Sequence, residues 1–434
     1  MTGRRTMIQS VTGADPQEVG ALGWSFLYFF CLLCGYYILR PVRDEMAIEG
    51  GVQHLPWLMT ATFLTMLAAT PLFGYLSGRI SRERLLLTVY AFFASHLVGF
   101  FVLMSAHVAP HWVARVFFVW LSVFNLFVVS VFWSFMADIF RPEQGLRLFS
   151  IIAAGGSTGA ILGPLLTTGL TYIMPIPGLM LVSAALLGMC WFCIRALDRW
   201  SKHQSTVGEW SGPGPATTGR GNAMGGSMWA GMRLTLSSPY LWGICAYLFL
   251  LTTTATFLYL EQTRLIGEQV GSAQGRTRLF AVMDLAVNVL SFLAQLFMTG
   301  PMMARFGLAA ALVLLPAASV VGFAVVGTFP VLLSFVLFTI VRRIGEYAVA
   351  KPGREVLFTV LNLEEKYKAK NFIDTAVSRA GDAATGWIVK GVRVLGIEAP
   401  QMAWTLIPLS LLWACLGWWL AKQEERKRFE RHGS

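Results

Sequence analysis

Ionisable residues are scarce in this chain. Only 13% of its 434 residues are Asp, Glu, Lys or Arg, while 56% are hydrophobic and the mean hydropathy is +0.61. A soluble domain of this size has no use for so much apolar surface, whereas a protein that crosses a membrane many times requires it. The composition therefore excludes a soluble globular protein and predicts a polytopic membrane protein.

Motifs that accompany chemical catalysis are also missing. The sequence contains no GxxxxGK[ST] loop for ATP hydrolysis, no HExxH, no cluster of metal ligands and no recognisable Ser, His and Asp set. His54, His107 and His111 fall in expected outer loops, where a solvated role is the default. We therefore expect no enzyme activity, no cofactor and no resident metal.

Cysteine is sparse, and its spacing carries little information. Two CxxC pairs, Cys31 with Cys34 and Cys190 with Cys193, lie inside apolar runs with no His or acidic ligand nearby. Buried thiols that act as small hydrophobic side chains account for them without zinc or redox chemistry. The polar start, MTGRRTMIQSVTGADPQEVG, precedes an apolar run without a small-residue cleavage site, so no cleaved signal peptide is expected.

Long apolar runs recur along the whole chain. Stretches of about 20 residues, the length that crosses a bilayer as a helix, occur about twelve times. They fall at 22–39, 55–76, 85–106, 113–137, 148–173, 179–194, 240–260, 279–299, 308–327, 331–350, 370–395 and 403–420. The segment between the sixth and seventh runs is rich in Gly, Ser, Thr and Pro and is typical of a flexible linker.

The layout predicts an all-α membrane protein with about twelve transmembrane helices in two six-helix halves, as in two-half transporters. The expected division is a tail at 1–20, a first bundle at 21–198, a linker at 199–238, a second bundle at 239–422 and a basic tail at 423–434.

Positive charge follows a topological pattern. The net charge of +11 comes mostly from Lys and Arg in alternate short connections, the linker and the C-terminal tail. Because such residues gather on the cytoplasmic side of a membrane, both termini are predicted to be cytoplasmic. Topology accounts for the charge, so we expect no nucleic-acid partner.

One segment, Thr339 to Lys390, carries ionisable residues inside expected membrane helices. An ionisable group in hydrocarbon costs about 3 kcal/mol or more, so such groups normally face a protein interior or a wet cavity. At helical spacing they lie toward one side of each of the two helices. These residues are Arg342, Arg343, Glu346, Asp374, Arg379 and Asp382. Two interpretations remain open: a pathway for an anionic solute, or ion pairs that only fix helix packing.

Other spans also carry polar faces. Tyr36, Arg40 and Arg43 share a face at the end of the first span, and the eighth span aligns Asp284 with Asn288. Spans with polar faces must border something wet or paired, which favours a central aqueous path. Alternatively, Arg40, Arg43, Asp44 and Glu45 simply extend to the membrane interface. In the fifth span, Gly155, Gly159 and Gly163 recur every fourth residue, which predicts close helix packing rather than a phosphate loop.

Several motifs resemble those of the major facilitator superfamily. GYLSGRISRER is similar to the superfamily's loop between the second and third helices, GxxxDxxGRR, without its acidic position. GAILGP resembles the glycine-proline motif of the fifth helix.

A more specific resemblance is to the ATP/ADP translocase-like nucleotide transporters of that group. The segment PGREVLFTVLNLEEKYKAKNFID, Pro352 to Asp374, resembles their Pro-x-Lys-Glu to Lys-Ala-x-Ile-Asp stretch, and LRPVRD resembles the end of their first helix. Lysines implicated in nucleotide binding in that family correspond here to Arg43 and Arg354, and Lys351 replaces an acidic residue. These changes keep or add positive charge but alter its geometry.

The resemblance implies a transporter that exchanges nucleotides of the ATP/ADP type, or another phosphorylated anion, by alternating access. On this hypothesis Arg40, Arg43, Arg342, Arg343 and Arg379 line the path, with Arg354 and Lys351 near its cytoplasmic mouth. Unneutralised arginines would prevent reorientation until an anion returned, so that transport would be by exchange.

Further roles follow from charge and aromaticity. Glu346, Asp374 and Asp382 are expected to hold the arginines, and Asn288 adds polarity to the eighth span. A proton on Asp284 or Glu346 is an alternative means of coupling. Tyr36, Tyr347 or Trp133 is expected to stack on a base.

Two other classes stay open: a proton-coupled carrier or efflux pump for a different solute, and a non-transporting membrane receptor or scaffold. The expected partners are a small anionic substrate and the lipid bilayer. The expected state is a monomer in a bacterial inner membrane.

Overall fold

The computed structural model describes residues 18–77, 82–206, 238–362 and 372–432, together with Arg233, Thr235, Glu365, Ala369 and Lys370. The described residues form helices and no strand. Several expectations lie largely outside the described residues: the N-terminal tail, most of the linker, the basic turn after the second span and part of the LEEKYKAK stretch.

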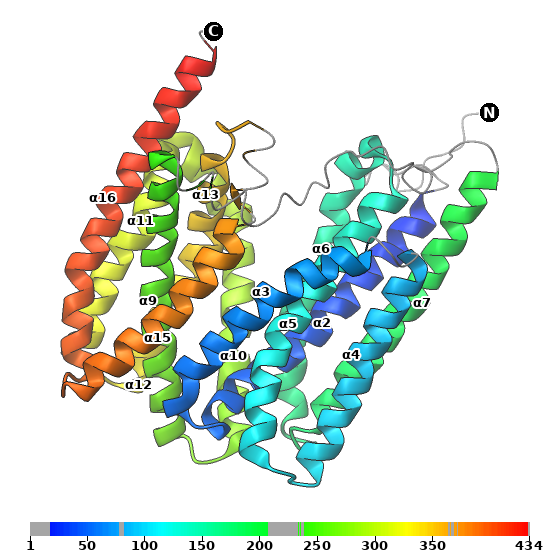
Figure 1. Ribbon diagram of the computed structural model, residues 1–434, viewed down its shortest axis with the longest axis horizontal. Coiled ribbons are helices and arrows are strands. Elements are labelled where there is room, and N and C mark those ends of the chain that lie inside the picture. Colours follow the sequence, from blue (N-terminus) through cyan, green and yellow to red (C-terminus); the bar gives the residue numbers. More distant parts are fainter. Residues whose placement is uncertain are drawn as a thin grey trace. The chain divides into compact units, whose positions relative to one another are not determined.

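The helices divide into two compact units (Figure 1). Unit 1 consists of Met1–Gly50, Ala69–Gly219 and Ser272–Leu285, and unit 2 of Gly51–Ala68, Arg220–Gly271 and Ala286–Ser434. Helices α3 (Leu55–Ser77) and α10 (Ala273–Ala294) therefore each contribute to both units. The division into a continuous first and second bundle stays a prediction.

Unit 1 is built mainly from α2 (Val19–Glu49), α4 (Arg82–Ser105), α5 (Pro110–Ile139), α6 (Pro142–Leu170) and α7 (Gly178–Thr206). Helix α2 packs against α5, α6 and α7. Prolines 110 and 142 open α5 and α6, where the missing N–H is not needed. The Gln144 side chain accepts a hydrogen bond from the Arg141 N–H at 2.9 Å, which caps the start of α6.

The glycine stripe of α6 is confirmed as a packing surface. A Cβ placed on Gly155 or Gly159 would lie 2.5 Å from the Phe26 carbonyl oxygen or 2.4 Å from that of Phe30, and one on Gly163 would lie 2.8 Å from the Cys34 carbonyl oxygen. These distances are shorter than any real Cβ contact, so only glycine lets α6 approach the backbone of α2 this closely.

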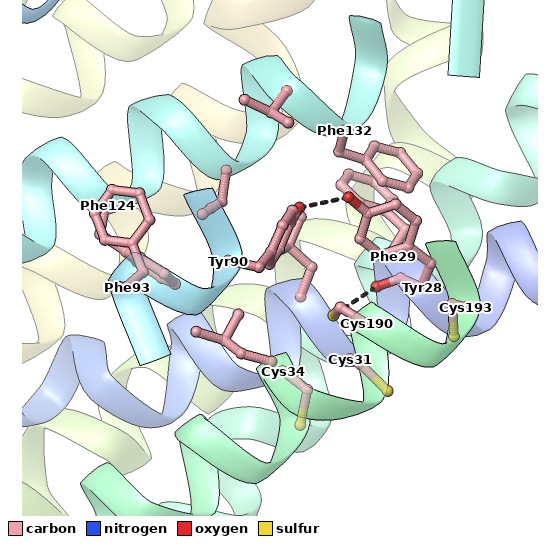
Figure 2. Close-up of a cluster of buried hydrophobic side chains, with 14 of the residues drawn as sticks. Tyr28, Phe29, Cys31, Cys34, Tyr90, Phe93, Phe124, Phe132, Cys190 and Cys193 are labelled. Carbon is pink, nitrogen blue, oxygen red and sulfur yellow. Dashed lines mark hydrogen bonds between the residues drawn. The ribbon is translucent and has the colours of Figure 1, made fainter. Parts of the chain in front are cut away.

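An aromatic cluster fills the interior of unit 1 (Figure 2). The Tyr28 hydroxyl donates to the Tyr90 hydroxyl at 2.6 Å, and the Phe132 ring packs on both Tyr28 and Phe29. Cys31, Cys34, Cys190 and Cys193 are free thiols buried in the same cluster, in agreement with their interpretation as small apolar side chains.

Unit 2 is built around α9 (Pro239–Gln269), which packs against α12 (Leu332–Gly345), α15 (Ser378–Val394) and α16 (Ala399–His432). Helix α11 (Gly300–Thr328) runs beside α16, as Figure 1 shows. Helix α13 (Lys351–Leu357) and the short 3-10 helix η1 (Val52–His54) complete the regular elements beside three π-helical segments. These segments are η2 (Gln295–Thr299), η3 (Glu346–Ala350) and η4 (Ile373–Val377).

Eight helical stretches in the described chain are long and apolar enough to cross a membrane. One of them, Ala273–Thr328, has 56 residues, far more than the roughly 20 that span a bilayer. It bends at Gly307, where a φ of 70° suits glycine, and the bend separates the expected eighth and ninth spans. The expected second, tenth and eleventh spans lie on α3, on α12 with η3, and on η4 with α15, but are not among the eight. The total of twelve spans stays a prediction.

Candidate substrate-binding site

Arg342 lies deep in unit 2, on the last turn of α12. Its guanidinium donates to the Leu251 carbonyl oxygen of α9 at 2.9 Å and pairs with Glu346 at 3.1 Å. The Arg342 side chain is only 3% exposed. Because a buried cation needs both a counter-charge and hydrogen-bond acceptors, these two partners explain how an arginine is stable at this position.

Asp382 on α15 forms another ion pair of this unit, with Arg379. One carboxylate oxygen accepts from Arg379 at 3.1 Å, and the other accepts from the Thr256 hydroxyl of α9 at 2.9 Å. The Thr385 and Thr253 hydroxyls are also 3.2 Å apart across the same two helices. The threonine run of α9 thus forms a polar surface against α15.

Close approach of α15 to α9 depends on Gly381. A Cβ at this position would lie 2.3 Å from the Thr252 hydroxyl oxygen. The adjacent Asp382 can therefore reach Thr256 on α9. We name Arg342, Arg343, Glu346, Arg379 and Asp382 the unit 2 cluster.

Three π-helical segments lie in or next to the helices of this cluster: η3 carries Glu346, η4 directly precedes α15, and η2 contacts η3. Glu346 opens η3, and Asp374 lies in η4. The wider π turn changes which carbonyls are bonded within the helix, and two η3 carbonyls accept hydrogen bonds from η2 side chains: Tyr347 from Gln295 at 2.9 Å and Ala348 from Thr299 at 2.6 Å. π-helical turns occur frequently at functional sites, and the hydrophobic periodicity of the sequence does not predict them.

The remaining expected residues of unit 2 are distributed around it. Arg354 on α13 pairs with Asp374 at 3.1 Å, which connects α13 to η4. Lys351 is exposed. Arg343 lies 5.9 Å from the Tyr347 ring centroid, a cation–π distance. Asn288 is half-buried on α10.

Unit 1 contains a separate set of charged side chains along α2, which we name the unit 1 cluster: Arg40, Arg43, Asp44, Glu45, Arg276 and Asp284. Arg40 pairs with Asp284 of α10 at 3.3 Å, and Arg43 pairs with its neighbour Asp44 at 2.9 Å. Arg276 of α10 donates twice to Glu45, at 2.7 Å each, and the Glu45 side chain is fully buried.

The unit 1 cluster differs from a set of side chains that extend to the membrane interface. Its carboxylates are buried and paired with arginines of the same unit. Sequence reasoning named Glu45 but not its partner Arg276, because the two residues are far apart in the chain. It also missed Thr256, for which the TTTAT run in α9 was the available signal.

The aromatic residues expected to stack on a base are placed differently from one another. The Trp133 indole packs edge-on against Phe29 and Phe149, in the aromatic interior of unit 1. Tyr36 is half-buried and contacts the Tyr37 ring. Their proposed role toward a base stays a prediction.

A third group of charges lies near the end of α9. Fully buried Glu261 pairs with Arg264 at 3.1 Å and also with Arg393 of α15. Arg264 pairs in addition with Glu268. This group connects α9 to α15 and is distinct from the unit 2 cluster. In the described part of the chain, no group of three or more His, Cys, Asp or Glu side chains could hold a metal ion.

Apolar membrane-length helices with buried arginine–carboxylate pairs define a multi-pass integral membrane protein of the transporter class. The model of the Major Facilitator Superfamily matches residues 25–350, and the chain belongs to that family.

The chain is also similar to two curated nucleotide carriers. It is 22% identical to "ADP,ATP carrier protein 1" of Chlamydia trachomatis serovar D over an alignment 467 positions long, gaps included, and this alignment covers 89% of this chain and 85% of that protein. The protein of the same name from Chlamydia muridarum gives the same identity and coverage. The resemblance to ATP/ADP translocase-like proteins is thereby confirmed as a distant similarity.

Solved structures with the same fold are secondary transporters. The nucleoside transporter NupG has a TM-score of 0.60 at 13% identity, covering 95% of this chain and 99% of that one. A POT family transporter in complex with a thioalcohol-conjugated peptide has a TM-score of 0.61 at 13% identity, covering 94% and 96%. At this identity the likeness concerns the fold alone. Family and structural neighbours are transporters, not enzymes.

Proposed function

We propose that this protein is a secondary transporter of nucleotides of the ATP/ADP type, or of another phosphorylated anion, and that it works by alternating access. The observation that carries the proposal is the unit 2 cluster, where Arg342, Arg343 and Arg379 lie on α12 and α15 together with the described carboxylates Glu346 and Asp382. The planar guanidinium fork matches phosphate oxygens, so these residues fit an anionic substrate. The similarity to proteins named ADP,ATP carriers supports a nucleotide.

Each charged residue has a role in this proposal. Arg343 and Arg379, which are less buried than Arg342, bind the anion, and Arg40 and Arg43 add positive charge in unit 1. Arg342 is held by α9 and positions Glu346. Arg354 and Lys351 attract the substrate near the cytoplasmic end, and Asp374 orients Arg354. Exchange of external for internal nucleotide is the first mode to test.

A proton-coupled carrier for another solute is the second candidate. It is favoured by Asp284, which is 2% exposed and lies 3.3 Å from Arg40. Carboxylates that lie beside a cation inside a membrane protein are typical of proton pathways. The proposal further includes a monomer in a bacterial inner membrane with both termini in the cytoplasm.

Uptake into proteoliposomes tests the proposed function. Vesicles loaded with ADP should accumulate labelled ATP, and Arg342→Ala should lower the initial rate by about a hundred-fold, as expected when one partner of a buried charge pair is removed. Arg428→Ala is the matched control, because Arg428 pairs with Glu424 at the same i, i+4 spacing in the C-terminal extension of α16. Its rate should stay near that of the wild type.

The outcomes separate the two candidates. No ATP uptake by folded wild-type protein would overturn the nucleotide assignment and leave the fold unaffected. Sensitivity to a pH gradient together with loss of transport in Asp284→Asn would favour the proton-coupled carrier.

A further inference from the structure

We propose that Asp382 replaces the substrate's anionic group as the partner of Arg379 whenever no substrate is bound, so that the carrier returns across the membrane without a counter-substrate. The inference rests on the proposed function and specifies its mode. It makes exchange optional rather than obligatory.

The charge balance of unit 2 is the starting point. Obligatory exchange follows if arginines stay unneutralised after the substrate leaves, because buried uncompensated charge opposes movement. This protein instead supplies carboxylates of its own: Glu346 for Arg342, Asp382 for Arg379 and Asp374 for Arg354. In unit 1, Asp284 is likewise the counter-charge of Arg40, and Asp44 is that of Arg43.

Of these pairs, Arg379 with Asp382 is best suited to exchange partners. The Arg379 side chain is 41% exposed, whereas that of Arg342 is 3% exposed and is anchored to the α9 backbone. Within the described part of the chain, Arg379 forms its ion pair with Asp382, at 3.1 Å. An accessible guanidinium with a single carboxylate contact can turn to a phosphate without breaking a buried network.

Thr256 makes the exchange reversible. Its hydroxyl donates to the Asp382 oxygen that Arg379 does not use. When Arg379 turns to the substrate, Asp382 therefore keeps one hydrogen bond and its orientation toward the arginine. When the substrate leaves, the same carboxylate is in place to pair with Arg379 again. Thr256 is thus a positioning residue, and Asp382 is an internal competitor of the substrate.

The test compares uptake of labelled ATP into proteoliposomes loaded with ADP and into vesicles without nucleotide, with the membrane potential clamped. The wild type should take up ATP in both. Asp382→Asn keeps the shape and the acceptor for Thr256 but removes the charge that compensates Arg379. The ratio of loaded to unloaded uptake should rise by about ten-fold or more in this variant, because removing one partner of an ion pair leaves the other uncompensated.

Two further comparisons guard against a merely structural effect. Thr256→Val should raise the same ratio, and Thr256→Ser, which keeps the hydroxyl, should restore it. Glu424→Gln removes a carboxylate from an arginine pair on α16, outside the proposed site, and should leave the ratio unchanged. If Asp382→Asn does not fold, the wild-type measurement and the two Thr256 variants still decide the question.

Three results would overturn the inference. Wild-type uptake only into ADP-loaded vesicles would establish obligatory exchange, and the proposed function would then survive without it. An unchanged ratio in Asp382→Asn would show that Asp382 does not compensate Arg379. No uptake in either kind of vesicle would overturn the proposed function, and the inference with it.

Discussion

At the scale of single residues, the charges inside this protein occur as pairs. Four arginines expected from the sequence to face a path lie near a carboxylate of their own unit: Arg40, Arg43, Arg342 and Arg379. Residues three or four apart on one helix, such as Arg342 with Glu346 and Arg379 with Asp382, are pairs that helical spacing can predict. Pairs between helices, such as Arg276 with Glu45, depend on the fold.

Glu45 provides the sharpest stability prediction at this scale. Glu45→Gln should lower the free energy of unfolding by about 3 kcal/mol, because it leaves the largely buried Arg276 without its counter-charge. The measurement is thermal unfolding of the purified protein in detergent, with the remaining folded protein detected by fluorescence-detection size-exclusion chromatography.

The control for Glu45 is Glu268→Gln. Glu268 pairs with Arg264, but its side chain is 55% exposed, and exposed pairs contribute only about 0–1 kcal/mol. Equal losses of stability in the two variants would contradict the importance of burial for the Glu45–Arg276 pair.

Among the helices, small residues allow close packing, and side chains donate hydrogen bonds to backbone carbonyls at the π-helical turns. Gly155, Gly159 and Gly163 bring α6 onto α2, as their four-residue spacing predicts. The π-helical turns η2, η3 and η4 were not predicted. Hydrophobic periodicity is assessed over a window of several turns, so it identifies a helix but does not resolve a single π turn within it.

A glycine substitution tests the α2–α6 contact. Gly159→Ala should destabilise the protein by about 1–3 kcal/mol or more, because the added methyl group overlaps the Phe30 carbonyl oxygen. The same thermal measurement in detergent applies. Gly188→Ala in α7 serves as the comparison, since a Cβ there has no atom within 4 Å. That variant should gain helix propensity and lose no stability.

At the scale of the whole molecule, the order of helices along the chain agrees with the sequence, whereas the compact units do not coincide with continuous stretches of it. Each expected span overlaps a described helix or pair of helical segments, although several of the expected ends differ. The first residues of α3 belong to unit 2, and those of α10 to unit 1. In unit 2, the Trp387 indole donates to the Thr60 hydroxyl of α3 at 3.0 Å, and in unit 1 Arg276 of α10 pairs with Glu45.

Topology gives a prediction at this scale. The distribution of Lys and Arg predicts that both termini are cytoplasmic, which would require an even number of spans. Fluorescent or enzymatic reporters fused to either end of the chain in a bacterial host should both report a cytoplasmic location. A periplasmic signal from one terminus alone would require an odd number of spans and would contradict the twelve-span prediction.

The amino-acid sequence is enough to predict the class of this protein, because apolar runs of membrane length admit few structures other than helices. It also indicates which charges lie inside the helices and which glycines pack. The helix contacts, by contrast, are needed to see that Thr256 holds Asp382, that Arg342 reaches the Leu251 carbonyl and that Arg276 neutralises Glu45. Such partners must approach to about 3 Å, and that distance depends on how each helix is rotated and bent against its neighbour, which helical periodicity does not specify.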